Sequence, residues 1–91
     1  MALFKAHRLN ARGLALADKG WFSEAEEAYR AAAAAKPSWS VPWFNLGLMH
    51  KSRGLWEASL ECNLRASELA PLDQAAWWNL GIAATALDRW D

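Results

Sequence analysis

The sequence has little cysteine, no excess charge and no long apolar stretch, and each shortage excludes a class of protein. The single cysteine cannot form a disulfide within the chain, which favours a reducing compartment. Lys and Arg total 10, as do Asp and Glu, so no bulk field attracts nucleic acid or an anionic membrane. No apolar run approaches the roughly 20 residues of a membrane-spanning helix, and charges come too early for a signal peptide. We therefore expect a cytoplasmic domain.

What the chain does contain is a repeat. Its 91 residues allow a single domain over 1–91, and seven of them are tryptophan. The segment PWFNLG at 42–47 recurs 34 residues later as AWWNLG at 76–81. The same step of 34 residues also relates Gly13 to Gly47 and Gly20 to Gly54. Phe22, Trp56 and Trp90 form an aromatic series at this step. The units are therefore 6–39, 40–73 and a truncated copy at 74–91.

Each unit is predicted to be a pair of helices, because apolar residues recur at three- and four-residue spacings and no stretch alternates as a strand does. Helices are expected over about 41–53, 57–69 and 74–87, with two more in the first unit. Gly54 and Pro71 end two of them. Ser40 and Asp73 are candidate N-caps, and Ser23 with Glu26 fits a capping box. The sequence thus predicts an all-α fold of five helices.

The glycines at 13, 47 and 81 stand in helix interiors, where glycine costs about 1 kcal/mol relative to alanine. Because this unfavourable residue recurs at the same position of each unit, we expect a second helix to pack so closely against each glycine that a side chain would not fit. Small partners are expected on the second helices, at Ala25, Ala32, Ser59 and Ala66. Trp43 and Trp77 are expected in the core. One helix pair cannot bury its apolar stripe alone, so the pairs are expected to stack and bury these stripes between them.

This pattern resembles the tetratricopeptide repeat, whose unit of about 34 residues matches the step found here. The matching residues are Trp43, Leu46, Gly47, Gly54, Ser59, Ala66 and Pro71 in the second unit, with Gly13, Gly20, Ala32 and Pro37 in the first and Trp77, Leu80, Gly81 and Ala84 in the third. The first unit departs from the pattern at Leu9 and Arg12. The resemblance implies an α-α superhelix of about two and a half repeats, and it says little about the partner.

The resemblance also implies that the first helix of each unit lines a concave groove for a protein or peptide. The implied groove residues are Asn10, Leu14, Phe44, Asn45, Leu48, Lys51, Trp78, Asn79 and Ile82. Apolar members would anchor a peptide, and the asparagine amides would bind its backbone. Alternatively, these asparagines bridge neighbouring helices. The lysine–arginine clamp that some family members use for acidic C-termini is not matched here.

No residue pattern predicts catalysis or a bound cofactor. His7 and His50 lie far apart in sequence, so a surface or groove position is expected for each rather than a metal site. Cys62 is expected to be a small buried thiol. The sequence therefore favours a protein-interaction scaffold that is not an enzyme.

Two rival functions remain open. Self-association is one alternative, because the third unit stops halfway: either the chain is cut from a longer protein or its open C-terminal end pairs with a second copy. RNA binding is a weaker alternative, since the segment 1–39 carries only six basic against four acidic side chains.

Overall fold

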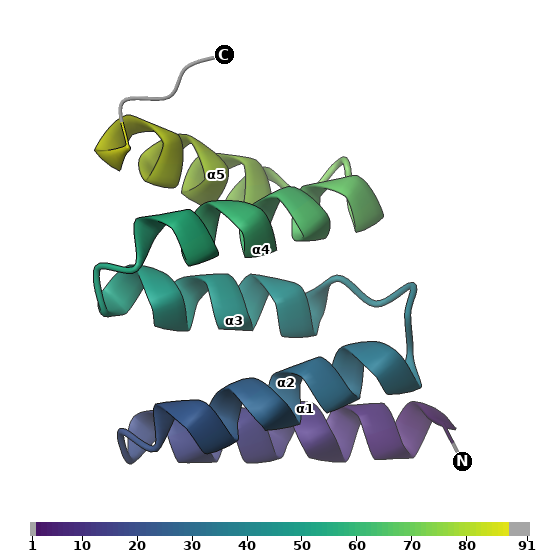
Figure 1. Cartoon of the computed structure of the whole chain (residues 1–91). Coiled ribbons are helices and arrows are strands. Elements are labelled where there is room, and N and C mark those ends of the chain that lie inside the picture. Colours follow the sequence, from purple (N-terminus) through teal and green to yellow (C-terminus); the bar gives the residue numbers. More distant parts are fainter. Residues whose placement is uncertain (1, 88–91) are drawn as a thin grey trace.

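The computed structural model describes residues 2–87, and every regular element in that range is an α-helix. α1 (Ala2–Asp18) pairs with α2 (Phe22–Ala35), and α3 (Val41–Ser52) pairs with α4 (Trp56–Leu69). α5 (Gln74–Ala86) packs on α4 and also touches α3. The helices stack in chain order, with α1 and α5 at opposite ends (Figure 1). The predicted all-α fold of five helices is confirmed for this range, whereas Trp90 lies outside the described residues.

The two hairpin turns have the same backbone structure. After α1, the amides of Lys19, Gly20 and Trp21 donate to carbonyls of Leu16 and Ala17, and the equivalent residues after α3 make the same bonds. Gly20 and Gly54 have φ angles of 80° and 71°, a left-handed conformation that glycine adopts without a Cβ penalty. The second hairpin therefore repeats the first in three dimensions as well as in sequence.

Helix N-termini agree only in part with the sequence-based predictions. Asp73 caps α5, because its carboxylate accepts a hydrogen bond from the amide of Ala75 at 3.0 Å. Ser40 makes no capping bond, since its helical φ and ψ of −75° and −23° do not aim its hydroxyl at the free amides. The capping box is also wrong: α2 begins at Phe22, so Ser23 already lies inside the first turn.

The hydrophobic core lies between the two hairpins. Its buried cluster consists of Ala25, Tyr29, Leu46, Met49 and Cys62, with Leu16, Ala17, Phe22 and Trp43 packed against it. These residues come from α1 to α4, and none comes from α5. The last helix is therefore attached to the stack by one face, outside the main core.

Two of the interior glycines are sites of close helix contact. A Cβ added at Gly13 would lie 2.6 Å from the ring of Tyr29, and one added at Gly47 would lie 2.7 Å from Nδ2 of Asn63. The small residues predicted as partners are fully buried, at Ala25, Ala32, Ser59 and Ala66. The glycines nevertheless face a larger side chain. Each leaves room for the residue that stands sixteen positions later, on the second helix of its own pair.

None of the described helices combines the length and the apolar character that crossing a bilayer requires.

Candidate functional site

Five of the nine residues expected to line the groove lie in two separate hollows. Leu14, Asn45 and Leu48 line a hollow of about 230 Å³ that α1, α2 and α3 enclose. Trp78 and Ile82 line a separate hollow of about 500 Å³ on α5. Phe44 is half-buried and belongs to the lining of neither hollow. The structure thus brings together two subsets of the predicted residues rather than all of them.

The polar members of the predicted set connect successive first helices. Nδ2 of Asn45 on α3 donates to Oδ1 of Asn10 on α1 at 3.1 Å. Nζ of Lys51 on α3 donates to Oδ1 of Asn79 on α5 at 3.0 Å. Asn10 and Asn79 are buried. Each of these asparagine side chains therefore takes part in a hydrogen bond between two helices. This agrees with the alternative interpretation, in which the asparagines bridge neighbouring helices.

The hollow on α5 is mostly apolar. Its lining, which we call the α5 surface, consists of Trp77, Trp78, Gly81, Ile82, Thr85 and Ala86. Trp78 is 73% exposed and Trp77 is 50% exposed. No ionisable residue belongs to this lining. Large aromatic side chains that stay in water while offering an uncharged concavity are typical of protein-binding sites.

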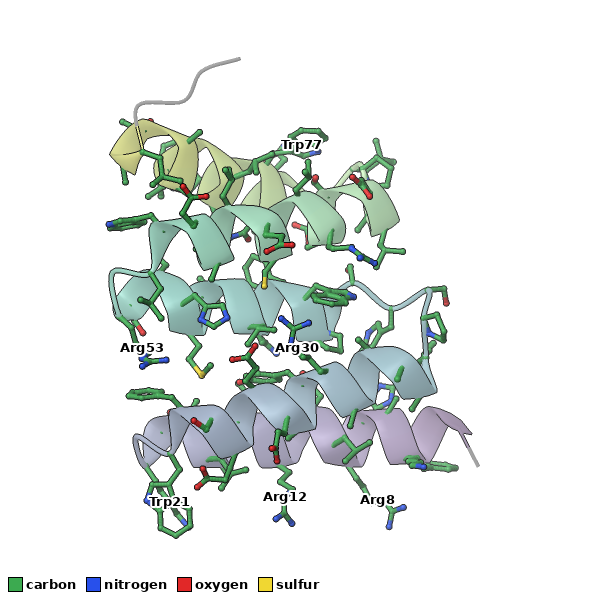
Figure 2. The ribbon with its side chains drawn as sticks, in the orientation of Figure 1. Arg8, Arg12, Trp21, Arg30, Arg53 and Trp77 are labelled. Atoms are coloured by element: carbon green, nitrogen blue, oxygen red, sulfur yellow. The ribbon has the colours of Figure 1, made fainter. Side chains whose placement is uncertain are left out.

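The prediction that Trp77 lies in the core is wrong. Its equivalent, Trp43, is half-buried against the core cluster and lies between the guanidinium groups of Arg30 and Arg65, at 5.6 and 5.1 Å from its ring centre. Trp77 instead lies on the outer side of α5, whereas Arg30 points into the layer between α2 and α3 (Figure 2). The indole of Trp77 donates to the carbonyl of Pro71 at 2.8 Å. The difference arises because no described helix covers α5 on that side.

A polar cavity holds two groups that would be candidates for chemistry, the His50 imidazole and the Cys62 thiol. His50, Cys62, Arg30, Arg65 and two glutamates line a space of about 200 Å³ between α2, α3 and α4. Burial raises the pKa of the Cys62 thiol to about 11, which leaves it protonated near neutral pH. Burial also lowers the pKa of His50, although nearby Glu26 opposes this shift. Burial therefore disfavours the charged imidazolium form of His50.

The expected surface or groove position of His50 is also wrong, because its side chain is only 4% exposed and lines the cavity between α2, α3 and α4. His7 is exposed and stacks on Trp39, with ring centres 4.3 Å apart. Among residues 2–87, no three side chains of the metal-binding types come together in a way that could hold an ion.

Sequence reasoning missed Trp77 and Gly81 as members of the α5 surface. Both were assigned to helix contacts because they repeat Trp43 and Gly47. What separates them is the covering helix, since Asn63 of α4 lies over Gly47 whereas no described side chain lies over Gly81. The repeat alone therefore identified the face, and the covering helix decides whether that face is core or surface.

Comparison of the sequence with protein-family models gives no match, and comparison with curated proteins gives none either.

Proposed function

We propose that this chain is a protein-interaction module of the tetratricopeptide type, a short solenoid that binds a peptide or helix of another protein. Two features support the proposal. The hairpins α1–α2 and α3–α4 repeat at one constant step in sequence, down to their turn hydrogen bonds. The first helices of the units also carry apolar side chains at equivalent repeat positions, namely Leu14, Leu48 and Ile82.

The observation that carries the proposal is the exposure of Trp78 beside Ile82 in the apolar hollow on α5. Burying an aromatic side chain of this size in a complex removes a large apolar area from water. Trp78 is 73% exposed in the free chain, so most of that area remains available to a partner. Phe44 and Leu48 stand at the repeat positions of α3 that are equivalent to Trp78 and Ile82 of α5, and side-chain hydrogen bonds link α3 to both α1 and α5.

Selection from a displayed library of random peptides tests the proposal directly. We expect enriched peptides whose affinity falls about tenfold or more in the Phe44→Ala, Trp78→Ala double variant, since buried aromatic anchors dominate such interfaces. Trp21→Ala is the matched control, because Trp21 is 56% exposed at the opposite end of the stack, in the α1–α2 turn. Equal affinity of both variants, or no enrichment, would reject the groove.

Self-association is a second candidate, favoured by the position of the α5 surface at one end of the stack. Two copies that met there would remove both pairs of exposed tryptophans from water. Sedimentation velocity across a wide concentration range distinguishes the candidates: a concentration-dependent dimer that Trp77→Ala dissociates supports self-association, and a constant monomer eliminates it.

A further inference from the structure

We infer that the α5 surface binds an α-helix of another protein chain whose contact stripe repeats that of α4. The inference rests on the proposed function and names the kind of partner that the site takes. Its basis is an interface that occurs twice inside the molecule. α2 covers the Gly13 face of α1, α4 covers the Gly47 face of α3, and no described atom comes within 4 Å of a Cβ built on Gly81.

The two existing interfaces agree in where the covering helix sits. The ring of Tyr29 lies above Gly13, and the amide of Asn63 lies above Gly47, each at less than 3 Å from a Cβ built on the glycine. Both stand sixteen positions beyond their glycine, in the middle of the covering helix. A helix placed the same way on α5 would bring its central residue over Gly81. That position is the open part of the 500 Å³ hollow.

The two covering helices also share the chemistry of their buried positions. Five positions, spaced i, i+3, i+4, i+7 and i+8, are buried in both: Ala25, Ala28, Tyr29, Ala32 and Ala33 in α2, and Ser59, Cys62, Asn63, Ala66 and Ser67 in α4. All ten side chains are uncharged and, apart from the central one, small. The partner should therefore carry small uncharged residues on this stripe and a planar Tyr or Asn at i+4.

The contact between Arg65 and Trp43 also predicts a basic residue in the partner helix. Arg65, at i+6 of the α4 stripe, lies 5.1 Å from the ring centre of Trp43. The equivalent ring on α5 is that of Trp77, which is half exposed. A guanidinium group over an indole face is a favourable cation–π contact. An arginine at i+6 of the bound helix would thus cover Trp77, as Arg65 covers Trp43.

A second folded copy does not offer such a helix. The α2 and α4 stripes are already buried within the stack, with exposed fractions between 0% and 6%. Two α5 surfaces facing each other would bring large tryptophans together, instead of placing small residues beside a glycine. The observations therefore favour a separate helix over a symmetric dimer.

The test uses the whole chain, labelled with ¹⁵N, and a synthetic peptide of residues 55–71 with blocked termini. Isolated helices of this length are marginal in water, so weak binding is expected and the peptide is titrated to millimolar concentration. We expect saturable shifts of the Gly81 amide and of the Trp77 and Trp78 indoles. Shifts confined to Gly47 would mean exchange with α4 and would overturn the inference.

Two matched pairs of variants make the result specific. In the protein, Gly81→Ala should weaken peptide binding at least tenfold, because its Cβ would occupy the space of the central peptide residue. In the peptide, Ala66→Leu on the stripe should abolish binding, whereas Leu64→Ala, at a position exposed in α4, should leave it unchanged. Equal binding by all variants would contradict the inference.

Failure of the inference can be told apart from failure of the proposed function. If library-selected peptides depend on Trp78 while the 55–71 peptide gives no shifts, the interaction module stands and the α4-like partner is wrong. If the α5 resonances shift with protein concentration alone and the peptide does not compete, the surface is an interface between copies, which also overturns the inference.

Discussion

α3 and α5 carry the same motif and lie in different surroundings. Gly47 of α3 is buried beneath Asn63, whereas Gly81 of α5 has no described neighbour above it. Trp43 packs between two arginines, and Trp77 is half exposed. The same residues thus form core in one layer and surface in the next. The comparison teaches that in a repeat, the role of a residue belongs to the interface between two helices and not to its own helix.

The two regions also depend on different interactions for stability. α1 to α4 contribute every member of the main core cluster and its packed neighbours, and α5 contributes none. Conversely, α5 is the helix with a side-chain N-cap, while α2, α3 and α4 begin without one. Helices packed on two sides are stabilised mainly by burial, whereas a helix packed on one side gains relatively more from its local ends.

The largest effect that separates the regions is expected from aromatic truncation. Tyr29 is 2% exposed at the centre of the core, so Tyr29→Ala should lower the free energy of unfolding by about 3–5 kcal/mol. Trp78 is 73% exposed, so Trp78→Ala should change the free energy of unfolding by less than about 1 kcal/mol. Urea denaturation followed by circular dichroism measures both. Similar losses in the two variants would show that α5 belongs to the core after all.

The interior glycines should respond to alanine in opposite directions. Gly47→Ala should destabilise the fold by about 1–2 kcal/mol, because overpacking against Asn63 outweighs the gain in helix propensity. Asn63 cannot simply withdraw, since it is fully buried and donates to the carbonyl of Ser59 at 2.8 Å. Gly81→Ala should stabilise the chain by up to about 1 kcal/mol, as its Cβ meets open space.

A double variant checks that the Gly47 effect arises from this contact. Asn63→Ala should make room for the new methyl group, so the cost of Gly47→Ala should shrink when both changes are present. Additive losses in thermal or chemical denaturation would locate the strain elsewhere. Destabilisation by Gly81→Ala would mean that the Gly81 face is covered in solution.

Much of the fold followed from the sequence, because periodic glycines and prolines encode where helices end. Gly54 was predicted to end a helix, and α3 gives way there to a left-handed turn. The α4 and α5 bounds agree with prediction to within a residue. Helix starts were less predictable. Ser40 has helical φ and ψ and makes no capping bond, and Ser23 lies inside α2, which begins one residue earlier.

The candidate site was predictable only as a helix face. The family resemblance implied a groove through Trp78 and Ile82, but it could not decide which repeated residues are covered. Trp77 and His50 show the two kinds of error, one exposed against expectation and the other buried. Each error concerns a contact with a different helix, and such contacts leave no mark in the local pattern of a single sequence.

The smallest of the expected differences concerns the helix caps. Asp73→Ala removes the hydrogen bond to the Ala75 amide and a favourable charge at the start of α5, which should cost about 1 kcal/mol. Ser40→Ala should cost almost nothing, because Ser40 makes no capping bond to α3. Asp73→Asn is the control, since asparagine caps nearly as well. Hydrogen exchange at the first amides of α5 reports the loss locally. If Ser40→Ala proved as costly as Asp73→Ala, the inner helices would need their ends as much as α5 does, and the contrast between a two-sided and a one-sided helix would fail.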